Sequence, residues 1–272
     1  MTVIAMTREI GSLGGEITYG VAAALDLKVL HHEAIEHHLA EKLHTSDSLM
    51  HRYVEGEASV IERWRIDRQK LVRHTKEELL AAAVEDDIII RGWGAASLLR
   101  PAAHVLRVRV CAPLHLRVER LASRIDKAGR PALRRMIEHS DGAQANAVAR
   151  QFGHDWTAPD LYHIVLNTES LPVAACISQL TGLARTSAFR ATAASNEVLT
   201  DMLLATRIRI ALDRALGAHH QIDVQVERGE ACLASTPGGQ DLVRQAAGIA
   251  RSVKGIGNIF HGNASTRLDL HL

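Results

Sequence analysis

Short apolar blocks alternate with longer helical stretches through the N-terminal part of the chain. The blocks are rich in β-branched residues and bounded by turn residues, and they cover residues 2–7, 88–90, 105–112 and 162–166. Blocks of this kind are typical of buried parallel strands. Helical periodicity fills much of the remaining chain, over residues 17–25, 33–43, 54–85, 114–139 and 171–184. Strands that alternate with helices predict an α/β fold, with a parallel sheet in a three-layer arrangement.

A different pattern follows a small, polar stretch at residues 186–197, which predicts a linker. Apolar residues then recur at three and four positions over residues 198–216, which predicts a helix that ends at Gly217. The rest of the chain predicts, in order, a strand at 222–226, a turn at 228–229, a strand through Leu233, a helix at 242–253 and a strand at 255–260. The order αββαβ predicts a small α+β domain, so the expected domains are residues 1–185 and 198–272.

The composition fits a soluble globular protein of two domains. The chain has 272 residues, 47% of them hydrophobic and 23% charged, and it exceeds the usual length of one compact domain. The formal charge of +1 creates no overall field that attracts nucleic acid or an anionic membrane. Any anion site therefore has to be local, and nucleic acid is not an expected partner.

Neither the N-terminus nor the cysteines indicate export. The first residues contain no basic leader followed by a long apolar run, and no uncharged apolar stretch approaches the roughly 18 residues of a spanning helix. The three cysteines, Cys111, Cys176 and Cys232, lie far apart in apolar sequence, as buried thiols do in a reducing compartment. We expect a cytoplasmic protein without integral membrane association.

A glycine cluster separates the first predicted strand from the first predicted helix. Such a loop directs backbone N–H groups to one spot at the positive end of a helix dipole, which favours an anion. A Walker loop has lysine and a hydroxyl residue after its last glycine, whereas Gly15, Glu16 and Ile17 follow Gly14 here. Taken alone, the loop is either a phosphate site or a plain tight turn.

Five segments, in their order and spacing, resemble the cytidylate kinase-like family over residues 2–185. They are TREIGSLGGEI at 7–17, RGWGAASLLR at 91–100, APLHLRVERLASR at 112–124, FGHDW at 152–156 and LYHIVLNT at 161–168. The resemblance implies a P-loop nucleoside monophosphate (NMP) kinase-like fold with ATP and Mg²⁺ as donor. It also implies a nucleoside monophosphate acceptor, a pyrimidine nucleotide such as CMP.

The family's loop is similar to SREFGSGGRE, and this chain matches it unevenly. The residues that the resemblance assigns to nucleotide binding are Arg8, Gly11, Ser12, Gly14, Gly15 and Glu16. Gly15 stands where the family has arginine, so a cation expected to neutralise the transferring phosphoryl group is missing. Three more polar positions also depart from the family pattern, at His31, Trp93 and Gln144.

Arg117, Arg120 and Arg124 recur at three and four residues, so they share one face of a predicted helix. The resemblance implies that these arginines form a lid and contact phosphate, which makes them the candidate catalytic residues. Without it, the row reads as a solvated helix paired with Glu119 and Asp126. The basic residues over 63–76 have two interpretations as well: one or two of them contact the acceptor nucleotide, or they form a solvated helix face.

Metal and nucleophile sites are not expected. The chain has 16 histidines, but the cluster at residues 31–38 lacks the HExxH spacing that places two imidazoles on one helix face. Cys111 lies inside an apolar strand, where a thiolate is disfavoured, and no GxSxG motif occurs.

Residues 198–267 resemble a BON domain, with the match concentrated in QAAGIARSVKGIGNI near the end. The resemblance implies a module that binds lipid, a small ligand or a protein partner and supplies no catalytic residue. Two hypotheses follow: a nucleotide-binding kinase tuned by this module, or a degenerate kinase fold that works as a regulatory protein through it. Long, alanine-rich apolar helices also permit a homo-oligomer.

Overall fold

A computed structural model describes residues 2–30, 32–54, 67–85, 87–92, 94–125, 129–218, 220–235 and 239–263. The chain divides into two compact units, of which the first comprises Met1–Ile66 and Glu85–Thr192 and the second comprises Asp67–Val84 and Ala193–Leu272.

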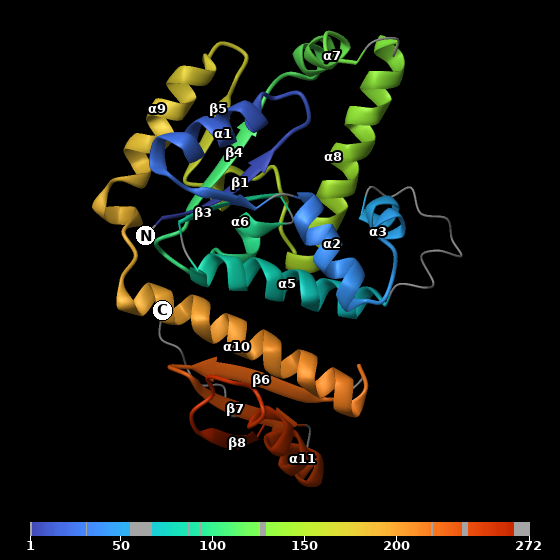
Figure 1. The fold of residues 1–272 in the computed structure, drawn as a ribbon, viewed down its shortest axis with the longest axis vertical. Helices are drawn as coiled ribbons and strands as arrows, with labels where there is room; N and C mark the ends of the chain where they lie inside the picture. The colour runs from blue at the N-terminus through green and yellow to red at the C-terminus, as the bar shows by residue number, and fades with distance from the viewer. Residues whose placement is uncertain are drawn as a thin grey trace. The chain divides into compact units, whose positions relative to one another are not determined.

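The first unit is built on a five-stranded, wholly parallel sheet with the strand order β2-β3-β1-β4-β5. Its strands are β1 (Val3–Arg8), β2 (Lys28–Leu30), β3 (Ile88–Arg91), β4 (Leu106–Cys111) and β5 (Ile164–Asn167). Its helices are α1 (Gly14–Leu25), α2 (His32–Lys42), α3 (Asp47–Val54), α6 (Ala95–Leu98), α7 (Leu114–Ala122), α8 (Arg130–Phe152) and α9 (Val173–Ala184). The parallel α/β fold expected from the apolar blocks is confirmed (Figure 1).

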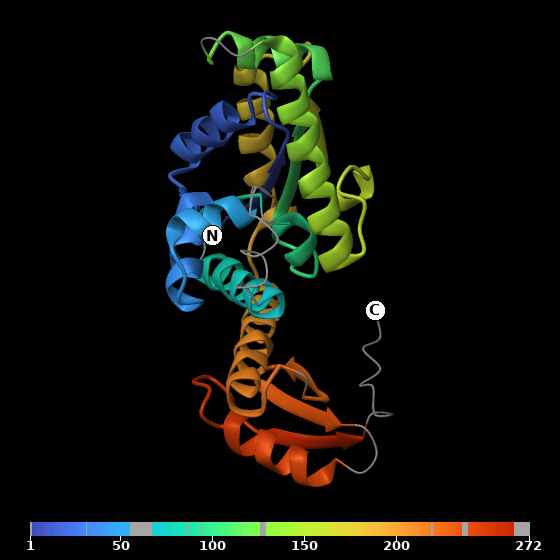
Figure 2. The same ribbon diagram turned by 90° about the vertical axis from the view of Figure 1, so that its right-hand side faces the viewer.

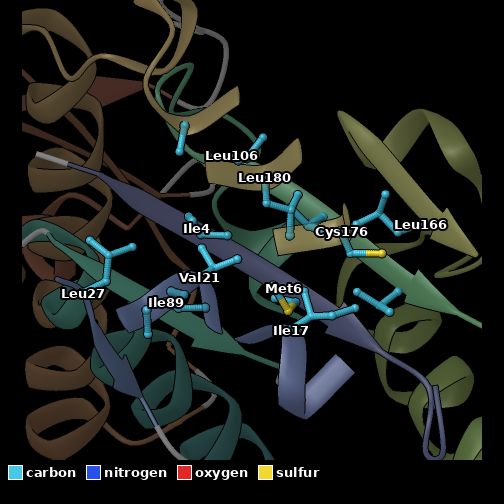
Figure 3. Close-up of a cluster of buried hydrophobic side chains, with 14 of the residues drawn as sticks. Ile4, Met6, Ile17, Val21, Leu27, Ile89, Leu106, Leu166, Cys176 and Leu180 are labelled. Carbon is cyan, nitrogen blue, oxygen red and sulfur yellow. The ribbon is translucent and has the colours of Figure 1, made fainter. Parts of the chain in front are cut away.

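Helices cover both faces of this sheet. α1 and α9 pack against each other on one face, where residues such as Ile17 and Leu180 meet Ile4, Met6 and Leu106 of the strands in one apolar core (Figure 3). Seen along the sheet, α1 and α8 lie on opposite sides of the strands (Figure 2). β1 is buried almost throughout because both of its faces are covered.

One predicted helix is interrupted. Periodicity predicted a single helix over residues 114–139, but α7 ends at Ala122 and α8 begins at Arg130. Gly129 caps α8, and Pro131 occupies its first turn, where the missing N–H of proline costs nothing. α7 and α8 pack against each other through a small core of their own, which includes Val118, Leu121, Leu133 and Ile137.

The second unit combines α5 (Arg68–Glu85, assigned to this unit through Val84) with the C-terminal elements. These are α10 (Ala193–Leu216), β6 (Ile222–Glu227), β7 (Glu230–Ser235), α11 (Gln240–Ala250) and β8 (Ile259–Asn263). Their order is αββαβ, although α10 begins before the expected start at Val198. β6 pairs antiparallel with β7, β8 pairs parallel with β7, and both C-terminal helices share one core with this sheet.

Candidate functional site

The candidate site is the loop between β1 and α1, at the carboxyl end of the parallel sheet. Gly11 has a φ of 79° and Leu13 a φ of 62°, so the backbone turns twice through the left-handed region before α1 begins. No side chain caps the N-terminus of α1. The amides of its first turn therefore have no partner within the helix, and they lie at the positive end of the helix dipole. This geometry is receptive to an anion.

Ser12 adds a polar group to this loop. Its side chain is 0% exposed, and its Oγ has no hydrogen-bond partner among the described residues. A Cβ built on Gly14 would lie 3.3 Å from that oxygen, which places the hydroxyl beside the first turn of α1. A buried hydroxyl without a partner costs about 1–3 kcal/mol, and an anion bound at the helix terminus would supply the missing acceptor.

The three glycines of the loop have different surroundings. A Cβ on Gly11 would lie 2.8 Å from both Arg117 O and Leu121 Cδ1, and a Cβ on Gly14 would lie 2.7 Å from Arg8 Cβ. These two positions exclude any side chain. A Cβ on Gly15 would have nothing within 4 Å among the described residues, so the position of the family's arginine is sterically open.

The loop lies where the chain reverses its direction of travel across the sheet. β1 is followed by β2 on one side of the sheet, whereas β4, its neighbour, is followed by β5 on the other side. In open α/β sheets, ligands bind in the crevice at such a switch point, beyond the carboxyl ends of the strands. The glycine loop therefore occupies the usual position of a binding site in this architecture.

Glu9 anchors the loop to β4. Glu9 is buried, and its Oε1 accepts a hydrogen bond of 2.6 Å from Arg109 Nη2 while its Oε2 accepts one of 3.2 Å from Ala112 N. The Arg109 guanidinium also donates to Trp156 O at 3.1 Å and lies 4.9 Å from the centre of the Trp156 ring. Pairing and cation–π contact compensate both buried charges, so this group is a rigid base for the loop.

Arg117 joins the loop to α8. Its Nη1 and Nη2 donate to the two carboxylate oxygens of Asp141 at 3.1 and 2.5 Å, and Nη1 lies 3.4 Å from Ile10 O. Burial by itself would lower the pKa of Arg117, but the hydrogen bond and charge of Asp141 and the charge of Glu9 raise it overall. Arg117 is therefore a permanently charged clamp whose Nη1 and Nη2 are engaged by protein acceptors.

Arg120 joins the loop to the end of β5. Its Nη1 donates to Thr168 Oγ1 at 2.9 Å and to Gly11 O at 3.3 Å, and its Nη2 donates to Thr168 O at 2.7 Å. Thr168 Oγ1 in turn donates to Ser12 O at 2.9 Å. The carbonyls of Ile10, Gly11 and Ser12 thus all accept from side chains outside the loop. The amides that follow them in the chain belong to the first turn of α1.

Arg124 differs from the other two arginines of α7 and the loop that follows it. Its side chain is 58% exposed and forms an ion pair with Glu16 on α1. An exposed pair of this kind contributes about 0–1 kcal/mol, so Arg124 can change partners at little cost.

The structure brings most of the predicted site residues together and explains several that the sequence did not single out. Arg8 lies beside Gly14, so the loop residues and the three arginines form one cluster. Asp141, Arg109, Trp156 and Thr168 were not expected to take part. Trp156 and Thr168 lie in the conspicuous FGHDW and LYHIVLNT segments, which was the available signal.

Other sequence expectations can be placed only in part. His31 and Trp93, two of the departures from the family pattern, lie outside the described residues, as do Arg63 and Arg65 of the basic segment. The pKa of the Cys111 thiol is raised, chiefly by burial and then by the charge of Glu9. This direction agrees with the expectation that Cys111 does not act as a nucleophile.

The sheet order and the glycine loop define the class: a parallel α/β protein with an anion-receptive loop between its first strand and first helix. The chain belongs to the cytidylate kinase-like family, whose sequence model matches residues 3–170. A comparison with curated proteins finds no match. No helix in the described parts of the chain is long and apolar enough to cross a membrane.

Solved structures of similar fold include proteins of known and unknown activity. An uncharacterized protein from Eubacterium ventriosum superposes with a TM-score of 0.54 at 13% identity, over 68% of this chain and 99% of the other. Shikimate kinase from Bacteroides thetaiotaomicron gives a TM-score of 0.42 at 14% identity, over 68% and 99%. A sugar kinase from a Janibacter species gives 0.40 at 19% identity, over 71% and 99%. At 13% identity the likeness to the first of these structures concerns the fold alone.

Proposed function

We propose that the chain binds the phosphates of a nucleotide at the glycine loop and transfers the γ-phosphoryl group of ATP to a pyrimidine nucleoside monophosphate such as CMP. The observation that supports this most directly is the uncapped start of α1 beside the buried Ser12 hydroxyl, which has no partner among the described residues. Membership of the cytidylate kinase-like family supports the choice of reaction.

The loop fits a phosphate better than it fits a metal ion. Within the described parts of the chain, no three His, Cys, Asp or Glu side chains gather as a metal site. Magnesium is usually held by one or two carboxylates together with substrate phosphates and water, so here it would arrive with the nucleotide. When bound, it supplies neutralising charge to the phosphates. The loop amides and the Ser12 hydroxyl would hold the phosphate oxygens.

The arginines divide into two roles under this proposal. Arg117 and Arg120 are positioning residues, because their donors hold the carbonyls of Ile10 and Gly11. Arg124 is the cation that turns from Glu16 to the transferring phosphoryl group. Arg124 would take over the role of the arginine that the family has at the position of Gly15, since its partner Glu16 is the next residue in the chain.

Binding is tested by calorimetric titration of ATP, CTP and CMP in the presence of magnesium. A Gly14→Ala variant should lose nucleotide binding, because the added Cβ approaches Arg8 Cβ to 2.7 Å and Ser12 Oγ to 3.3 Å. The matched control is Gly182→Ala on α9, where an added Cβ meets nothing within 4 Å among the described residues. No heat for any of the three nucleotides at millimolar concentration, or equal affinity in both variants, contradicts the proposal.

Transfer is tested by CMP-dependent formation of ADP. Removal of a cation that stabilises a transition state lowers kcat by about 100-fold, so the kcat of Arg124→Ala should fall by that order. The kcat of Arg134→Ala should stay unchanged, because Arg134 is paired with Glu138 on an exposed part of α8. Gly15→Arg, in open space, should raise the rate. Equal rates for the two alanine variants would remove Arg124 from the mechanism.

A second candidate is a degenerate kinase fold that acts as a regulatory or interaction protein. It is favoured by the missing side chain at Gly15 and by the protein partners of all three arginines. The working surface would then be the αββαβ part of the second unit, taken as a BON-like domain at residues 198–267 that binds a protein or a small ligand. Nucleotide binding without turnover, unchanged by Gly15→Arg, would favour this candidate.

A further inference from the structure

Leu13 adopts an unusual backbone conformation at the start of α1. Its φ of 62° and ψ of 12° lie in the left-handed region, where the Cβ of an L-residue crowds the following carbonyl oxygen. Among the described residues, Leu13 is the only aliphatic side chain with a positive φ; the other non-glycine residues in this group are Asp26, His44, Asp87 and Arg228. Such strain persists only where the surrounding contacts impose it.

Two hydrogen bonds hold the peptide groups on either side of Leu13. On the N-terminal side, Ser12 O accepts a hydrogen bond of 2.9 Å from Thr168 Oγ1. On the C-terminal side, Leu13 O accepts one of 3.1 Å from Ile17 N, in the first turn of α1. Because each peptide group is planar, fixing both groups also fixes the φ and ψ of the residue between them. The conformation of Leu13 is therefore imposed by Thr168 on one side and by α1 on the other.

Thr168 is itself held firmly in place. It is 2% exposed, and its N–H donates to Cys111 O of β4 at 2.9 Å. Its hydroxyl accepts a hydrogen bond of 2.9 Å from the Arg120 guanidinium while it donates to Ser12 O. A hydroxyl that accepts from a cation becomes a stronger donor. The hydrogen bond to Ser12 O is thus buried and reinforced.

The left-handed turn at Leu13 also shapes the anion site. A left-handed residue next to a right-handed one forms a concavity into which successive N–H groups point, and Leu13 followed by the helical Gly14 is such a pair. In a trans peptide the N–H points away from the C=O, so the hydrogen bond to Ser12 O directs the Leu13 N–H away from Thr168. If Leu13 relaxed to a negative φ, this concavity would be lost.

We propose that Thr168 is a positioning residue for phosphate, because its hydroxyl holds Leu13 in the strained conformation that directs the loop amides to the anion. This rests on the proposed function only in taking the glycine loop as a phosphate site. Leu13 opposes the binding conformation and Thr168 imposes it, so relieving the strain at Leu13 should repair a loss at Thr168. Glycine relieves the strain, since it populates positive φ about as readily as negative φ.

The test is calorimetric titration of the full chain and its variants with inorganic pyrophosphate, without magnesium. Thr168→Val keeps the side-chain shape but removes the hydroxyl, so it should weaken pyrophosphate binding about tenfold. Adding Leu13→Gly to Thr168→Val should restore the affinity to within about threefold of the unmodified chain. Thr168→Ser, which retains the hydroxyl, should bind like the unmodified chain.

The matched control is Thr75→Val on α5. Thr75 is 4% exposed and its hydroxyl donates to Leu71 O at 2.8 Å, so it is also a buried hydroxyl bonded to a main-chain carbonyl. Thr75→Val should leave the affinity for pyrophosphate unchanged. Equal affinities of Thr168→Val with and without Leu13→Gly would overturn the proposal, because a general loss of packing at Thr168 is not repaired at Leu13.

A second pair of variants covers the case in which Thr168→Val does not fold. Leu13→Val leaves Thr168 intact but places a β-branched residue in the left-handed region, where it is tolerated even less than leucine. It should weaken pyrophosphate binding about tenfold, whereas Leu13→Gly alone should change the affinity by less than about threefold. Equal affinities for these two variants, or no heat from the unmodified chain, would overturn the proposal.

Failure of the proposed function gives a different result. If pyrophosphate binding follows the expected pattern while ATP, CTP and CMP do not bind, the positioning role of Thr168 is supported and the proposed function is contradicted.

Discussion

Gly11 is the residue on which the packing of α7 against the loop depends. Its φ of 79° lies in the region that favours glycine, and α7 approaches so closely that a Cβ would lie 2.8 Å from Arg117 O. Backbone strain and steric overlap each cost about 1–3 kcal/mol. We expect Gly11→Ala to lower the free energy of unfolding by about 2–4 kcal/mol, measured by urea denaturation.

Gly15→Ala is the matched control for this substitution. Gly15 lies in the first turn of α1, has no positive φ, and has open space around its Cβ position. Alanine at such a helical position is neutral or stabilises by about 0.5–1 kcal/mol. If the two variants unfold at the same urea concentration, the inference that α7 packs closely against Gly11 is wrong.

The identity of the loop residues could be predicted from sequence, but their partners could not. Spacing placed Arg117, Arg120 and Arg124 on one helix face, and the structure does bring all three to the loop. Their different partners come from α8, β5 and α1, and no local pattern encodes contacts across such distances in sequence. Asp141 and Thr168 were missed for this reason.

Among the elements, the pair α7 and α8 shows where periodicity misleads. The apolar pattern continues across residues 123–129, so it predicted one helix, yet Gly129 and Pro131 mark the start of α8. These turn signals were present in the sequence. They rule out one continuous helix despite the apolar pattern, because proline cannot occupy a helix interior without losing a hydrogen bond. The strands β1, β3 and β4 were easier to predict, since each is a short apolar block that is largely buried. The short, partly exposed β2 was not among the predicted blocks.

The link between α7 and α8 should depend on Asp141. Asp141→Ala leaves the buried Arg117 guanidinium without its bidentate acceptor, and loss of one partner of such a pair costs about 1–3 kcal/mol when the site is partly exposed. We expect a loss of that size in urea denaturation.

Glu138 on the same helix provides the comparison. Its pair with Arg134 is exposed on both sides, so Glu138→Ala should change the free energy of unfolding by less than about 0.5 kcal/mol. Equal effects of the two substitutions would mean that Asp141 does not hold Arg117 in solution.

A histidine at the start of β5 should make the first unit sensitive to acid. Burial, and then the charge of Arg107, lower the pKa of His163 below its ordinary 6.5, and His163 Nδ1 accepts a hydrogen bond of 3.0 Å from Arg107 N. As pH falls below 6.5, the unfolded chain binds this proton before the folded chain does. The contribution of His163 is therefore complete above that pH and lost below it.

This pH dependence can be measured by urea denaturation between about pH 7.5 and about pH 5. His163→Gln should lose less stability over that range than the unmodified chain. His37 provides the opposite sign, because its hydrogen bond and charge interaction with Asp47 raise its pKa, so it stabilises the folded state at low pH. His37→Gln should lose more stability on acidification, and identical curves for both variants would contradict the assignment.

At the scale of the whole molecule, the second unit is discontinuous in sequence. α5 lies between β2 and β3 in chain order, yet it groups with the C-terminal elements. A division at residues 186–197 follows naturally from the small, polar composition there, but composition carries no information on which helices pack together across a long insertion. That division of the chain remains a prediction, to be tested by truncation.

A chain that ends at residue 192 keeps the glycine loop and the five-stranded sheet but lacks α10. Arg73 then loses Asp213, its buried partner, and Glu77 loses Arg207. Breaking a buried ion pair costs about 3–5 kcal/mol, and for a domain of this size each kcal/mol lowers the melting temperature by about 2–4 °C. We expect the fragment to melt roughly 6–20 °C below the full chain in a calorimetric scan.

A chain that ends at residue 263 is the control for this truncation, because it retains every described element and should melt with the full chain. Introducing Arg73→Met into the short fragment should recover part of the loss, since the uncompensated charge is then removed. If the fragment ending at residue 192 melts at the temperature of the full chain, α5 is stabilised by the first unit instead. The nucleotide titrations could then be made on that fragment alone.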